Sequence, residues 1–144
     1  MLKRLLFLTL VTISVMSCNI FRPISLVPSF DAAIVNDITA LGKQVDGMYI
    51  KMEQSNDKTF ASYAADYLSG EVLINSRIAR DEARPKTKGS EAILKQANLY
   101  RNMYLKNMED HRVKIKLNNS EIRILKKYLQ DQLTPLFVSE MSLK

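Results

Sequence analysis

Apolar residues recur at alternating spacings of four and three along much of this chain, and this periodicity is the strongest constraint on its fold. After Asp31 the repeated residues are Ile34, Ile38, Leu41, Val45, Met48 and Met52. Such an a/d heptad seam, sustained over about 19 residues, is typical of a helix that packs lengthwise against other helices. Gly42 and Gly47 interrupt the seam, each at a cost of about 1 kcal/mol relative to alanine, and can allow close approach of a neighbouring helix.

Three further segments show the same kind of pattern. The apolar side of the second comprises Phe60, Ala64, Tyr67, Leu68, Ile74, Ile78 and Ala79. In the third, the repeated residues are Ile93, Ala97, Tyr100, Tyr104, Met108, His111 and Ile115. The fourth carries Ile122, Leu125, Leu129, Leu133 and Leu136. Each spacing places its residues on one side of a helix.

Turn and capping residues divide these segments into four predicted helices. The expected ranges are about 30–54, 59–84, 90–117 and 120–142. Ser29, Ser90 and Ser120 are the expected residues at the helix starts, since serine is favoured at N-caps. Pro135 lies inside the last range, where proline removes a backbone hydrogen bond and clashes with the preceding turn. We therefore expect a kink or break near Pro135.

These helices predict an all-α fold, an antiparallel four-helix bundle formed by residues 30–144 as one domain. The chain has only four glycines and four prolines among 144 residues, and its common residues favour helix. A domain of this length can bury a sizeable core without disulfides or metal. A less favoured alternative is a three-helix bundle with the fourth helix detached.

The N-terminal 18 residues have the organisation of an export signal. Lys3 and Arg4 precede an apolar run over residues 5–16, which is too short for a typical membrane-spanning helix. The run ends in Val15-Met16-Ser17-Cys18, which resembles a relaxed form of the lipobox of bacterial lipoproteins. The resemblance covers residues 1–18 alone. It implies cleavage before Cys18, acylation of Cys18 with fatty acids such as palmitate, and attachment of the protein to a membrane of the cell envelope.

Two other interpretations of this stretch remain open: an ordinary secretory signal cut at the same bond, and a cytosolic protein with an apolar N-terminus. Under the lipoprotein interpretation, Cys18 is consumed and no other cysteine is present for disulfides, metal binding or catalysis. Residues 19–29 contain Pro23 and Pro28 and would form an extended tether. By resemblance, Asn19 and the lack of an acidic run after Cys18 favour the periplasmic side of the outer membrane.

A polar layer is expected near the middle of the bundle. Folding the second and third helices back on each other about residues 87–88 brings Glu71 level with Tyr104 and Asn75 level with Tyr100. These four residues could form a small pocket for a ligand. The simpler interpretation is that the tyrosine hydroxyls satisfy a partly buried carboxylate and amide.

Metal and cofactor sites are not indicated by the sequence. His111 is the only histidine, and a di-iron bundle needs Glu-x-x-His motifs on facing helices. Met108 stands three residues before His111, so the motif is absent. We interpret His111 as a residue at the edge of the core, level with Tyr63 and Ala64. No catalytic motif is recognised, and the sequence predicts no metal, cofactor or catalytic residue.

Charge is unevenly distributed along the chain. Residues 19–85 carry 7 basic and 9 acidic side chains, whereas residues 86–144 carry 12 basic and 6 acidic ones. The basic residues gather around the turn between the third and fourth helices: Arg112, Lys114, Lys116, Arg123, Lys126 and Lys127. This basic cluster could contact anionic headgroups or an acidic partner, or be an ordinary solvated surface; nucleic acid is not expected in the envelope.

Taken together, these features predict a lipid-anchored, non-enzymatic helical bundle that serves as a protein-interaction or scaffold module in the bacterial envelope. Its expected partner is another envelope protein. The alternative is a bundle that binds a small ligand through the predicted polar layer.

Overall fold

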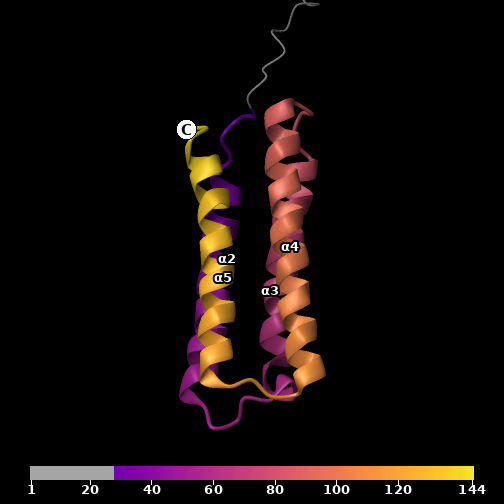
Figure 1. Ribbon diagram of the computed structural model, residues 1–144. Coiled ribbons are helices and arrows are strands. Elements are labelled where there is room, and N and C mark those ends of the chain that lie inside the picture. Colours follow the sequence, from indigo (N-terminus) through magenta and orange to yellow (C-terminus); the bar gives the residue numbers. More distant parts are fainter. Residues whose placement is uncertain (1–27) are drawn as a thin grey trace, which may run out of the picture.

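The computed structural model describes residues 28–144, which form an antiparallel four-helix bundle (Figure 1). The helices are α2 (Ala32–Gln54), α3 (Phe60–Glu82), α4 (Lys88–Lys114) and α5 (Asn119–Met141). α2 and α4 each lie between α3 and α5. The predicted signal, Cys18 and all but the last two residues of the predicted tether lie outside the described residues.

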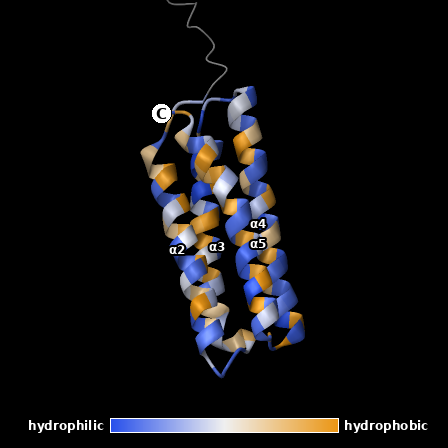
Figure 2. Cartoon of the chain, turned by 60° about the vertical axis from the view of Figure 1, so that its left-hand side comes forward, coloured by the Kyte–Doolittle hydropathy of each residue, from blue (hydrophilic) through white to orange (hydrophobic). Residues whose placement is uncertain are grey.

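The predicted heptad seam of α2 forms the centre of the core. All six of its residues are buried, with exposed fractions of 1% or less. Leu129 and Leu136 of α5 are buried with them, so the fourth helix belongs to the bundle and is not detached. Figure 2 shows hydrophobic residues recurring along every helix, which is the patterning that a shared core requires.

The helix starts differ from the predicted ones by one or two residues, and the capping residues of α2, α4 and α5 differ from the predicted serines. Asp31, not Ser29, caps α2, and its carboxylate accepts a hydrogen bond from the amide of Ala33 at 2.8 Å. Thr87 caps α4 and forms a reciprocal capping box with Ser90. Asn118 caps α5 in the same way with Glu121. Each cap satisfies amides that have no partner within the helix.

The third helix ends at Lys114, three residues before the predicted end. Ile115 has a φ of 66°, and its carbonyl accepts a hydrogen bond from the amide of Phe60 at 2.8 Å. The amide of Leu117 donates to the carbonyl of Lys58 at 3.2 Å. These bonds join the α2–α3 and α4–α5 loops at one end of the bundle, and this contact between distant segments ends the helix.

α5 runs without a break from Asn119 to Met141, with Pro135 inside it. Pro135 is exposed, whereas Leu129 and Leu136 are fully buried on either side of it. Core packing therefore holds the helix together across the hydrogen bond that the proline removes.

The buried face of α3 is rotated relative to the predicted one. Its buried residues are Tyr63, Tyr67, Gly70, Ile74, Arg77, Ile78 and Asp81. Leu68, predicted to be in the core, has an exposed fraction of 58%. Gly70, Arg77 and Asp81 complete the buried face in place of Leu68 and Ala79.

Candidate functional site

The four residues of the predicted polar layer do not come together. Tyr100 and Tyr104 are buried, Glu71 is half-buried and Asn75 is exposed. The Tyr104 hydroxyl donates a hydrogen bond to the carbonyl of Tyr67 at 2.9 Å. The predicted alignment of the second and third helices correctly placed Glu71 near Tyr104. Burial is the main reason that the pKa of Tyr104 is raised, and the neighbouring tyrosines and the charge of Glu71 raise it further. The rotation of α3 turns Asn75 outward.

Aromatic rings fill the bundle where the layer was expected. The ring centroids of Tyr67 and Tyr104 are 6.0 Å apart, and those of Tyr67 and His111 are 5.7 Å apart. Phe60 lies edge-on to His111 at 5.7 Å. Burial raises the pKa of Tyr49 to about 12 and moves the pKa of Tyr67 further above its usual value. Tyr49, Tyr67 and Tyr104 are thus neutral core residues at neutral pH.

His111 is fully buried and is not the edge residue that we predicted. Its Nε2 lies 3.0 Å from the carbonyl oxygen of Lys58, so Nε2 must carry the proton and donate. Nδ1 then accepts a hydrogen bond from the Tyr67 hydroxyl at 3.1 Å. Burial lowers the pKa of His111 below its usual value. The side chain joins α4 to α3 and to the α2–α3 loop, which is a structural role.

A cluster of four charged side chains is buried at the end of the bundle where the described chain begins, and sequence reasoning missed it. Its members are Arg77, Asp81, Arg84 and Glu140. Nη1 of Arg77 lies 3.2 Å from Oδ2 of Asp81. Nη2 of Arg84 donates to Oε1 of Glu140 at 2.5 Å, and the same oxygen accepts from the amide of Asp31 at 2.9 Å.

Burial governs the electrostatics of this buried charged cluster. It lowers the pKa of Arg77 and raises the pKa of Asp81, despite their mutual attraction. The two positive and two negative side chains compensate each other and join α3 to α5. The spacings from Arg77 to Asp81 and from Asp81 to Arg84 are those of ion pairs along one helix. These spacings were the one indication of the buried charged cluster in the sequence.

Most of the predicted basic cluster is engaged in ion pairs. Four of its six residues pair with carboxylates: Arg112 with Glu109, Lys114 with Glu121, Arg123 with Glu53 and Lys127 with Asp131. No ion pair of Lys116 or Lys126 is found within residues 28–144. The cluster lies around the α4–α5 loop, at the end opposite the beginning of the described chain (Figure 1).

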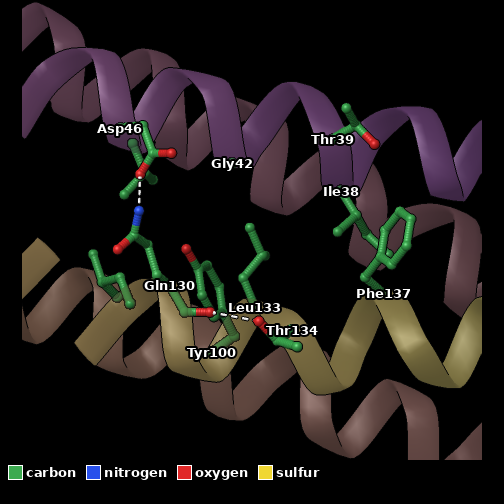
Figure 3. A pocket seen from close by; sticks show the side chains of 11 residues that line it. Ile38, Thr39, Gly42, Asp46, Tyr100, Gln130, Leu133, Thr134 and Phe137 are labelled. Atoms are coloured by element: carbon green, nitrogen blue, oxygen red, sulfur yellow. Dashed lines mark hydrogen bonds between the residues drawn. The ribbon is translucent and has the colours of Figure 1, made fainter. Parts of the chain in front are cut away.

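A groove of about 330 Å³ lies between α2 and α5, with Tyr100 of α4 at its base (Figure 3). Its apolar lining is provided by Ile38, Val45, Leu129, Leu133 and Phe137. Gly42 and four polar side chains complete the wall: Thr39, Asp46, Gln130 and Thr134. The alternative considered from the sequence was a ligand pocket beside Glu71; of the four residues assigned to that pocket, only Tyr100 lines the groove.

One polar group of the groove lacks a partner. Tyr100 has an exposed fraction of 2%, and its hydroxyl has no hydrogen-bond partner within the described part of the chain. Nε2 of Gln130 donates to Oδ1 of Asp46 at 2.6 Å across the groove. Thr39 and Thr134 donate their hydroxyl protons to carbonyls of their own helices. Tyr100 is therefore the buried polar group of the groove that has no partner within residues 28–144.

The outer face of α3 carries no charge over five helical turns. Its exposed positions are Ala61, Ser62, Ala65, Leu68, Ser69, Val72, Asn75, Ser76 and Ala79. Leu68 and Val72 stand one turn apart, with exposed fractions of 58% and 67%. The charged residues of the same stretch, such as Asp66 and Glu71, are half-buried beside it. We call these nine residues the uncharged face of α3.

Within residues 28–144, no group of three potential metal-ligating side chains is found. None of the four helices combines the length and the apolar composition that crossing a membrane requires. Comparison with protein-family models, with curated proteins and with solved structures finds no match to this chain.

Proposed function

We propose that this chain is a non-enzymatic protein-interaction module, held at a membrane of the bacterial envelope by acyl chains on Cys18. The uncharged face of α3 carries the proposal. Leu68 and Val72 project from it, and small residues surround them, so that a helix of a second protein can approach closely. Exposed apolar side chains that lie together on one face are typical of interaction surfaces.

The direction of the bundle fits such an anchor. The described chain begins at the end that holds the buried charged cluster, and the helices extend away from it (Figure 1). α4 has 27 residues and is therefore about 40 Å long. A tether attached at that end would place the uncharged face along the side of a domain that stands out from the membrane, accessible to a partner in the periplasm. We favour the periplasmic side of the outer membrane.

The interaction can be tested by chemical cross-linking in membranes of the native cell, followed by purification of the protein. We expect one partner to be cross-linked to the wild type and lost in the variant Leu68→Glu/Val72→Glu. The matched control is Val113→Glu/Ile124→Glu, whose parent side chains have exposed fractions of 71% and 67% on α4 and α5. Equal yields of the cross-linked partner from both double variants would contradict the proposal.

The anchor is tested independently by mass spectrometry of the native N-terminus. We expect a chain that begins at Cys18 and carries acyl chains, and a Cys18→Ala variant that is neither processed nor acylated. Two or more acyl chains give stable membrane attachment, whereas one alone does not. A chain that keeps residues 1–17 and carries no lipid would refute this part of the proposal.

A further inference from the structure

The groove between α2 and α5 has the construction of a binding site for a small molecule. Its volume of about 330 Å³ falls within the range of ligand pockets, roughly 300–1,000 Å³. Five apolar side chains line it, and one buried hydroxyl without a partner lies at its base. We propose that the groove binds one small, neutral, mostly apolar molecule whose oxygen accepts a hydrogen bond from Tyr100. This inference does not depend on the proposed function, because the uncharged face belongs to α3.

Gly42 keeps the groove open. A Cβ atom at this position would lie 3.1 Å from Cδ2 of Leu133, on the opposite wall. Any larger side chain would occupy the space between α2 and α5. Glycine inside a helix is unfavourable relative to alanine, so its presence here is explained by the space that it leaves.

Tyr100 provides the specific contact. In Figure 3 it projects between Gln130 and Leu133, with its hydroxyl toward α2. Burial is the main reason that the pKa of Tyr100 lies above its usual value, so the hydroxyl keeps its proton and can donate it. A buried donor without a partner is unfavourable. A carbonyl, ether or hydroxyl oxygen of a bound molecule would satisfy it.

The charge of the groove disfavours anionic ligands. Asp46 is its one charged lining residue among residues 28–144, and its carboxylate is held at the rim by Gln130. A carboxylate or phosphate in the groove would face this negative charge across a largely apolar space. The expected ligand is therefore neutral, with an apolar body that contacts Ile38, Leu133 and Phe137.

The test uses Prodan, a neutral fluorescent naphthyl ketone whose emission responds to polarity, titrated with the purified full-length chain. We expect saturable one-to-one binding with blue-shifted emission. Gly42→Leu should weaken binding by at least about tenfold, because its side chain fills the groove. Tyr100→Phe should weaken it by about two- to tenfold, the effect of one lost hydrogen bond. A naphthoate with the same ring system should bind more weakly than Prodan.

Gly47→Ala is the matched control, since no atom lies within 4 Å of the added Cβ; its affinity should equal that of the wild type. Circular dichroism verifies that each variant is folded. If Gly42→Leu is unfolded, Gly42→Ala and the near-isosteric Tyr100→Phe decide the question. Absence of saturable binding to the wild type, equal affinity of the wild type and Tyr100→Phe, or tighter binding of the naphthoate would each overturn the proposal.

Discussion

Glu140 shows how much a single buried carboxylate can organise. It is fully buried near the C-terminus, yet it contacts Arg84 at the end of α3 and the amide of Asp31 before α2. Three segments that are far apart in the sequence thus meet at one side chain. A charge in this position is tolerated only because its partners are buried with it.

We expect Glu140→Ala to lower the free energy of unfolding by about 3–5 kcal/mol, because it removes the hydrogen-bonded partner of the buried Arg84 and leaves the cluster with an excess positive charge. Urea denaturation at neutral pH measures the change. Asp131→Ala is the control, since Asp131 pairs with Lys127 on the surface and should change stability by less than about 0.5 kcal/mol. A similar small loss for both variants would show that the buried charged cluster contributes little to stability.

His111 makes stability depend on pH near neutrality. Burial lowers its pKa in the folded state, so the unfolded chain takes up a proton first as the pH falls. Stability should therefore decrease as the pH falls below about 6.5, by at most about 1.4 kcal/mol per pH unit for this one proton. Denaturation midpoints measured at several pH values between about 7.5 and 5.5 test this, above the range in which ordinary carboxylates titrate.

The variant His111→Gln cannot titrate in this range and serves as the control. Its stability should be lower than that of the wild type, because Tyr67 and Lys58 lose their imidazole partner, but it should be nearly constant between those pH values. An equal pH dependence in both proteins would show that another group is responsible.

At the scale of the helix, α2 and α3 contain glycines with different roles. Gly47 of α2 has no neighbouring atom within 4 Å of an added Cβ. At Gly70 of α3, an added Cβ would lie 2.8 Å from Cζ of Tyr104 and collide with its hydroxyl. Gly70 thus allows the Tyr104 ring to lie against the backbone of α3 and reach the carbonyl of Tyr67.

We expect Gly47→Ala to stabilise the protein by up to about 1 kcal/mol through helix propensity alone. Gly70→Ala should destabilise it by about 1–3 kcal/mol, because overpacking displaces Tyr104. Thermal denaturation of both variants provides the comparison. The combination Gly70→Ala/Tyr104→Phe should recover part of the loss, and a stabilising effect of Gly70→Ala alone would refute the close contact.

The periodicity of each helix predicted some core faces better than others. Every residue of the α2 seam is buried as predicted, because large aliphatic side chains mark that face without ambiguity. The periodicity of α3 predicted Leu68 and Ala79 as core residues, whereas its buried face includes Gly70, Arg77 and Asp81. Buried charges and glycines carry no apolar signal, so the rotation of this helix could not be obtained from hydrophobicity.

At the scale of the whole molecule, α5 completes the core. It contacts α2 and α4, buries Leu129 and Leu136, and supplies Glu140 to the buried charged cluster. The bundle should therefore unfold in one cooperative transition. A three-helix core that folds on its own would need the seam of α2 to be buried without any contact to α5.

We expect a chain that ends at Asn118 to lack a cooperative urea transition, because the α2 seam and Arg84 would be exposed. Circular dichroism during urea titration tests this. Removal of residues 142–144 alone, which follow the end of α5, should leave the midpoint nearly unchanged. A sharp transition in the chain that ends at Asn118 would revive the three-helix alternative.

The sequence by itself determined the class of the fold, the number of helices and their approximate ends, because periodicity, caps and turns are local and recur along the chain. Only the tertiary structure decided the rest. The buried charged cluster, the partners of His111 and the groove above Tyr100 each combine side-chain or backbone groups from three separate segments. Such sites depend on how far each helix is rotated, and that rotation is set by the packing of all four helices together.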